Sequence, residues 1–185
     1  MKNIIPYRNI LPNIDKSAFI AHSAIISGDV KIGINSGVWY NCVIRGDVTK
    51  ITIGNNTNIQ DGSILHGTRP NHAQNKTKEN GAPVIIGDNV TVGHNAIVHA
   101  CIIENNAFIG MGSIIMDLTR VEEYGMLAAG AVLTPNKVIR SGQIWAGNPA
   151  KYFRDMTQQE KDYIKISADN YAELAREYLL HKISE

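Results

Sequence analysis

Three histidines in the middle of the chain have the residue type and spacing of a metal site: His66, His94 and His99. His66 and His99 each directly follow an aliphatic residue, whereas His94 lies two positions after Val92. Neutral imidazole is the commonest metal ligand in proteins. Three histidines form the ligand set of a catalytic zinc site in which the fourth position stays open for water or substrate.

A six-residue repeat must position these histidines. Aliphatic residues recur at this interval, at Ile14, Ile20, Ile26, Ile32, Val38 and Ile44, then at Ile53, Ile59 and Leu65, then at Ile86, Val92 and Val98, and from Ile103 through Leu133. Small or β-branched residues follow four positions after most of them. The phase slips by three near Lys50, and the polar stretch 67–83 interrupts it. A period of six fits neither a helix nor a single half-buried strand, but it is the signature of a parallel β-helix.

The chain therefore divides into two parts. Residues 1–150 are predicted to form a mainly β, hexapeptide-repeat solenoid with a loop extruded at 67–83, and Gly-Asn and Gly-Asp-Asn sequences supply its corners. Residues 151–185 are predicted to carry one α-helix. Thr157 and Glu160 have the spacing of a capping box at its start, and a helical stripe of apolar residues follows. We expect this helix to pack on the solenoid or on a neighbouring subunit.

Net charge, the length of apolar runs and the number of cysteines argue against several classes of protein. The 185 residues have a formal net charge of +1, which argues against a nucleic-acid binder that works by bulk charge. No apolar run reaches the roughly 20 residues that a membrane span needs. Two cysteines, Cys42 and Cys101, cannot build a disulfide framework, so we expect a cytoplasmic protein in which both thiols serve packing.

The repeat also places the histidines relative to one another. If three hexapeptides make one coil, His66 and His99 lie on the same face in adjacent coils, about 4.8 Å apart. His94 lies on the next face and could join them only from a neighbouring chain, as in a cyclic trimer. Arg45 shares the register of His66 and Asp61 that of His94, so these two residues would pair across the same subunit boundary.

Several motifs together resemble the gamma-class carbonic anhydrases: Arg45-Gly46-Asp47, the Gln60-Asp61 pair followed by His66, and Gly93-His94 through His99. The resemblance covers nearly the whole chain. It implies a left-handed β-helix homotrimer in which His66, His99 and the neighbouring chain's His94 bind zinc. It also implies that Arg45, Asp47 and Asp61 form interface salt bridges.

The same resemblance implies the reaction, which is hydration of carbon dioxide to bicarbonate by a zinc-bound hydroxide. Gln60 would hydrogen-bond the hydroxide or the bicarbonate, with Asn58 as a helper. Iron or cobalt could replace zinc, because three imidazoles do not dictate the metal.

The sequence departs from the family in two places. Val48 stands where well-studied members carry a glutamate, and the loop 67–83 has no clear counterpart of the acidic proton-shuttle loop. We expect His72, in that loop, to be a polar loop residue rather than a proton shuttle. Two other functions therefore stay open, a hexapeptide acyltransferase or acyl-CoA thioesterase, and a non-catalytic trimer stapled by its metal.

Overall fold

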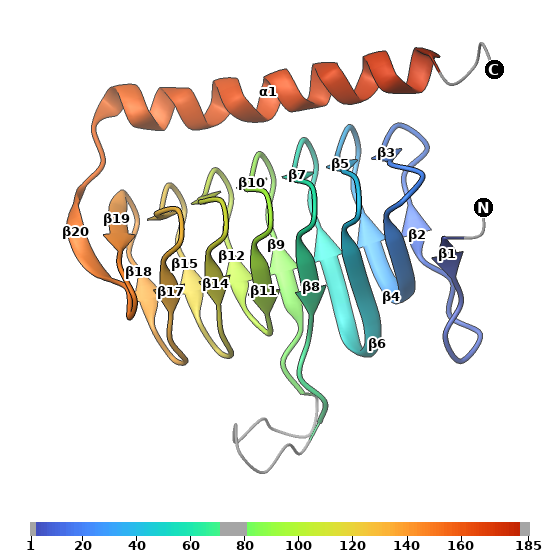
Figure 1. The fold of residues 1–185 in the computed structure, drawn as a ribbon, viewed down its shortest axis with the longest axis horizontal. Coiled ribbons are helices and arrows are strands. Elements are labelled where there is room, and N and C mark those ends of the chain that lie inside the picture. The colour runs from blue at the N-terminus through green and yellow to red at the C-terminus, as the bar shows by residue number, and fades with distance from the viewer. Residues whose placement is uncertain (1–2, 71–80, 182–185) are drawn as a thin grey trace.

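The computed structural model describes residues 3–70 and 81–181, and they form a three-sided parallel β-solenoid with one helix lying along it (Figure 1). Face one consists of β2 (Asn13–Ile14), β9 (Val84–Ile86), β12 (Ile102–Ile103), β15 (Arg120–Val121) and β18 (Val138–Ile139). Face two consists of β3 (Phe19–Ile20), β5 (Gly37–Val38), β7 (Asn58–Ile59), β10 (Thr91–Val92), β13 (Phe108–Ile109), β16 (Met126–Leu127), β19 (Gln143–Ala146) and β20 (Lys151–Asp155). Face three consists of β1 (Ile4–Ile5), β8 (Ile64–His66), β11 (Ile97–His99), β14 (Ile114–Ile115) and β17 (Val132–Leu133).

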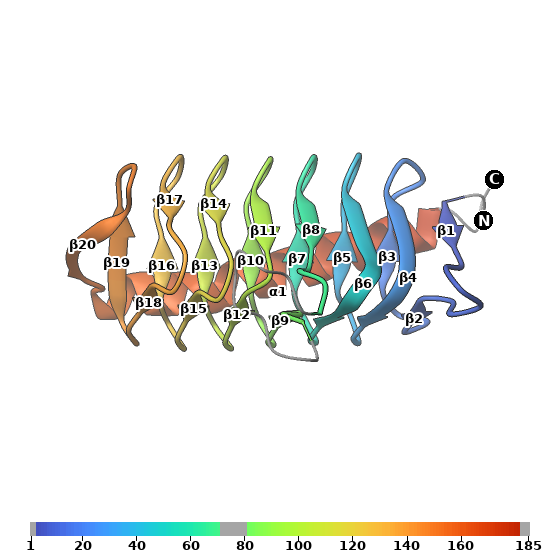
Figure 2. The ribbon, with the colours of Figure 1, turned by 90° about the horizontal axis from the view of Figure 1, so that it is seen from below.

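Two longer strands, β4 (Ile25–Ile32) and β6 (Val43–Ile53), pass from face three into face one. Among the strands of residues 3–70 and 81–181, neighbours pair in parallel except for β20, which runs antiparallel to β19. Figure 2 shows the coils stacked along one axis. The β-helix predicted from the period of six is confirmed.

The core consists of aliphatic columns in register between coils. Ile59 pairs with Val92 on face two, and Leu65 pairs with Val98 on face three; each of these four side chains is 0% exposed. Burying such a side chain contributes about 1.5–3 kcal/mol. The columns fix the register of the coils, because a slip by one residue would turn every aliphatic side chain toward solvent.

The predicted slip of three residues is located in β6. On β4 the stretch from Gly28 to Val30 faces the stretch from Gly46 to Ile51, so β6 carries three additional residues at this corner. Asp47 and Val48 lie in this stretch of β6.

The neck of the interrupting loop is a short antiparallel contact. The backbones of Thr68 and Ala82 exchange two hydrogen bonds of 2.9 Å each. His72 and Glu79, between them in sequence, lie outside the described residues.

The C-terminal helix α1 (Gln158–His181) packs on face two of its own solenoid, against β3, β5, β7 and β10 (Figure 1). Its predicted capping box is present: the Thr157 hydroxyl accepts the Glu160 N–H at 3.2 Å, and the Glu160 carboxylate accepts the Thr157 N–H at 2.9 Å. Tyr178 packs on Phe19 with ring centroids 5.2 Å apart. No helix in the described part of the chain is long and apolar enough to span a membrane.

Candidate metal centre

His66 and His99 meet on face three, as the repeat predicts. β8 and β11 pair in parallel with His66 directly opposite His99. The two ring centroids are 5.3 Å apart, and Nδ1 of His66 lies 3.2 Å from Nε2 of His99. The predicted register of this pair is confirmed.

Each imidazole is held from its outer side by an aspartate. Nε2 of His66 lies 3.0 Å from Oδ1 of Asp47, and Nδ1 of His99 lies 2.7 Å from Oδ1 of Asp117. An ionised carboxylate can only accept hydrogen bonds, so both outer nitrogens act as donors. In the neutral rings the two inner nitrogens then present lone pairs to each other.

Two lone pairs at this separation repel, and either a proton shared by the rings or a metal ion between them removes the repulsion. Zn–N distances of about 2.0–2.1 Å and tetrahedral angles place two ligand nitrogens roughly 3.3 Å apart. The observed 3.2 Å separation is close to this value. The pair therefore fits two positions of a zinc site, with the carboxylate–histidine support typical of such ligands.

Burial favours the neutral, metal-binding form of His66. Burial lowers the pKa of the His66 imidazole by more than the hydrogen bond with Asp47 raises it. Burial alone would raise the pKa of Asp47, but the hydrogen bonds it accepts from Arg45 and His66 outweigh burial and lower that pKa. The Arg45 guanidinium lies 2.5 Å from Oδ2 of Asp47. Asp47 therefore stays ionised as an acceptor for His66.

His94 lies on another side of the same chain, in the turn after β10. Its Nδ1 is 2.8 Å from Oδ2 of Asp61, and its side chain is 38% exposed. Within the described residues of this one chain, no three His, Cys, Asp or Glu side chains converge on a metal position. The structure thus brings together His66 and His99, and it leaves His94 apart from them.

Gln60 and Asn58 support the turn that carries His94. Oε1 of Gln60 accepts the backbone N–H of His94 at 3.2 Å, and Nε2 of Gln60 donates to Oδ1 of Asn58 at 3.1 Å. Asn58 in turn donates to Thr91 at 3.0 Å. Gln60 and Asn58 are 5% and 2% exposed. They form a buried network beside His94, away from the same chain's His66 and His99.

The predicted pairing of Arg45 with Asp61 is not formed within one chain. Arg45 pairs with Asp47, and Asp61 bonds His94 and accepts the backbone N–H of Tyr40 at 3.0 Å. The pairing between subunits therefore stays a prediction, as do the interface salt bridges.

Sequence reasoning missed three residues around this site, and two of them, Asp117 and Thr68, support His99 directly or through each other. Asp117 lies 18 residues after His99, whereas the paired strands set Val98 opposite Ile115, 17 residues further on. Counting one coil on from His99 therefore ends at Met116, and Asp117 is the residue after it. Tyr7 was also missed; it lines the same hollow as His66 and His99.

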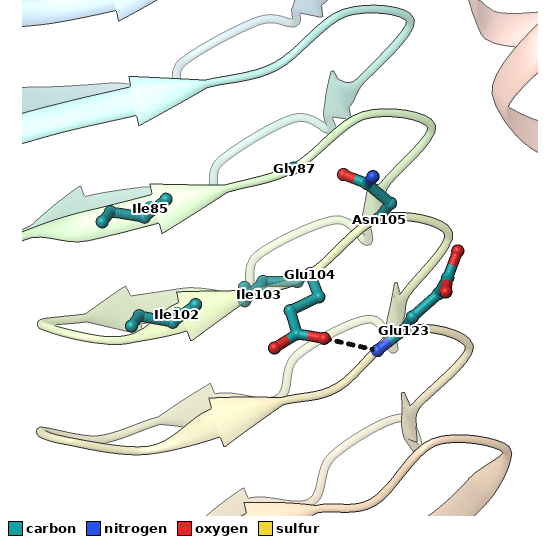
Figure 3. Close-up of a pocket in the computed structure, with 7 residues that line it drawn as sticks. All are labelled: Ile85, Gly87, Ile102, Ile103, Glu104, Asn105 and Glu123. Carbon is teal, nitrogen blue, oxygen red and sulfur yellow. Dashed lines mark hydrogen bonds between the residues drawn. The ribbon is translucent and has the colours of Figure 1, made fainter.

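Both cysteines and the Glu104 carboxylate have structural roles. Burial raises the pKa of Cys42 to about 11 and also raises the pKa of Cys101, and both thiols are buried as predicted. A second hollow, on face one, contains Glu104 and Glu123 (Figure 3). The Glu104 carboxylate pairs with Arg120 and accepts the Glu123 N–H at 3.2 Å, so it ties adjacent coils together.

No protein-family model matches the chain. Gamma carbonic anhydrase 1, mitochondrial, from Arabidopsis thaliana is 48% identical over 165 residues, which are 89% of this chain and 58% of that relative's length. A carbonic anhydrase from Geobacillus kaustophilus is 42% identical over 175 residues, which are 95% of this chain and 90% of the relative. Among solved structures, a hexapeptide transferase family protein from Anaplasma phagocytophilum is 46% identical, with a TM-score of 0.86 over 96% of this chain and 99% of that one. The chain therefore belongs to the gamma-class carbonic anhydrase family of hexapeptide-repeat proteins.

Proposed function

We propose that this protein is a zinc-dependent carbonic anhydrase that hydrates carbon dioxide to bicarbonate and works as a homotrimer with metal sites between subunits. One observation carries the proposal: the facing nitrogens of His66 and His99 lie 3.2 Å apart while both outer nitrogens are held by aspartates. This arrangement supports a metal ion held between the two rings.

The third ligand in this proposal is His94 of a neighbouring subunit. The side chain of His94 is partly exposed and lies on a different side of the solenoid from His66 and His99. A threefold axis parallel to the solenoid would set face two of one subunit against face three of the next, and so complete a three-histidine site.

Zinc held in this way supplies a water-derived nucleophile near neutral pH. The chain's own residues orient the partners of that reaction. Asp47 and Asp117 hold two of the imidazoles, and Gln60 fixes the turn of the third. Gln60 has a second amide N–H besides the one donated to Asn58, and it can orient a substrate oxygen. The water that becomes the nucleophile must lose a proton, and Val48 has no group that could accept it. A dissolved buffer would then take up this proton, so the rate of hydration should rise with the concentration of imidazole buffer.

The proposal is tested by metal content and carbon dioxide hydration in two variants, His94→Ala and His99→Ala, with the exposed His22→Ala as the matched control. Each site variant alone should lose metal and activity, whereas the control should keep both. A wild-type protein without bound metal after zinc loading would refute the proposal.

Mixed trimers test whether His94 acts from the neighbouring chain. A subunit with His94→Ala still offers His66 and His99, and a subunit with His99→Ala still offers His94. Co-expressed together, the two inactive variants should regain metal sites and hydration activity. No recovery in verified mixed trimers would show that the three histidines do not meet across the interface.

One relative favours a second function. The Anaplasma phagocytophilum protein, 46% identical, is described as a hexapeptide transferase family protein. Turnover of acyl-CoA without carbon dioxide hydration would favour an acyltransferase or thioesterase. Bound zinc without either activity would favour a trimer that the metal merely staples.

A further inference from the structure

Asp117 occupies a position that the metal-site motifs of the sequence do not include. It follows β14, in the coil next to that of His99, and its Oδ1 lies 2.7 Å from Nδ1 of His99. The Asp117 side chain is 13% exposed, so this bond is largely shielded from water. A carboxylate there selects the tautomer of His99 in which Nδ1 carries the proton and Nε2 carries the lone pair.

Thr68 fixes the second oxygen of the same carboxylate. The Thr68 hydroxyl donates to Oδ2 of Asp117, and Thr68 is 5% exposed. Its backbone is pinned by the two 2.9 Å bonds to Ala82 at the neck of the 67–83 loop. With one oxygen on Thr68 and the other on His99, the plane of the carboxylate is fixed by two separate coils.

We infer that Asp117, oriented by Thr68, is a positioning residue that directs Nε2 of His99 toward the metal. The inference rests on the proposed function, because it gives the metal ligand its outer partner. Asp47 does the same for His66, but that carboxylate is also paired with Arg45.

The first test is zinc affinity, measured by competition with a chromophoric chelator. Outer partners of ligating histidines are typically worth 10–100-fold in affinity. Asp117→Ala should weaken zinc binding by about that factor. Asp117→Asn keeps an acceptor oxygen and should weaken zinc binding less than Asp117→Ala does. Thr68→Val should also weaken zinc binding less than Asp117→Ala does. Asp88→Ala is the matched control, because Asp88 also accepts one bond from an adjacent coil, the Asn55 N–H at 2.7 Å, but touches no histidine.

The second test needs no metal. In metal-free protein labelled with ¹⁵N-histidine, NMR should show His99 with its proton on Nδ1 in the wild type and in Asp88→Ala. Asp117→Ala should redistribute the proton between the two nitrogens. A purely structural role would change stability but leave this tautomer unchanged.

The two proposals fail in different ways. If the wild type binds no zinc, the proposed function is refuted, while the tautomer measurement still reports on Asp117. If the wild type binds zinc and Asp117→Ala changes neither zinc affinity nor the tautomer, the positioning role is refuted and the proposed function stands.

Discussion

The buried amide of Gln60 offers a sharp test of what this residue does. The family resemblance gives it a role toward substrate, whereas the structure places it in a network with His94 and Asn58. Replacing it by methionine keeps most of its volume but removes its acceptor and its donor. The His94 N–H and Oδ1 of Asn58 would then each lose a partner.

The magnitude follows from the burial of these groups. Each buried polar atom left without a partner costs about 1–3 kcal/mol. Asn58 is 2% exposed, so its Oδ1 could not replace the lost hydrogen bond by one with water. His94 is half-buried, so its backbone N–H could in part be hydrogen-bonded by water instead. We expect Gln60→Met to lower the free energy of unfolding by about 2–4 kcal/mol in total.

The assay is urea unfolding at one fixed protein concentration, because subunit association would add to the measured stability. Gln158→Met on the exposed start of α1 is the control and should stay within about 0.5 kcal/mol of the wild type. If Gln60→Met abolishes hydration without lowering stability, Gln60 acts on the substrate alone and the supporting role argued from the network is wrong.

Three further predictions concern the scaffold. Gly110→Ala should strongly destabilise the fold, because the new Cβ would lie 2.3 Å from the backbone nitrogen of Ala129. Gly112→Ala would meet nothing within 4 Å and should cost only the roughly 1–2 kcal/mol of a side chain at positive φ. Thermal unfolding of the two variants would compare the steric and the backbone cost, and equal losses of stability would contradict this prediction. The hydrogen bonds from Arg154 and Thr157 lower the pKa of Glu160 from its usual 4.5 to about 2. This carboxylate therefore stabilises the fold above about pH 4.5 and loses its contribution as the pH falls toward 2. Glu160→Gln should flatten the pH dependence of the helical circular dichroism signal between these values, and an unchanged profile would contradict the role of Glu160 as a cap. Cys42 and Cys101 should react with a thiol reagent only after unfolding, because burial disfavours both thiolates; rapid labelling of the folded protein would contradict this.

The fold and the histidine pair could be predicted because one period controls both. Columns such as Ile59 on Val92 tolerate no slip, so a residue next to an inward aliphatic has a fixed face and a fixed neighbour one coil away. The same count located the three extra residues in β6.

What the sequence could not provide is the direction of individual side chains. Register places Arg45 beside His66, but it does not say that the guanidinium turns to Asp47. Gln60 and Asn58 lie two residues apart on one face, yet their bond depends on rotamers and on the helix above them. The N-terminal strand β1, which pairs with β4, lies outside the repeat count and leads to Tyr7 at the metal hollow.

The lengthwise course of α1 changes how such a solenoid can fold and fray. In a stack of repeats each coil contacts only its neighbours, so coils can form or open one at a time. Here α1 contacts β3 near the start of the chain and β10 in its middle, and Tyr178 packs on Phe19. These contacts join residues that are far apart in sequence, so each of them closes a long loop of the chain. The first coils therefore cannot open without also breaking their contacts with α1, which ties the stability of this end of the solenoid to the helix.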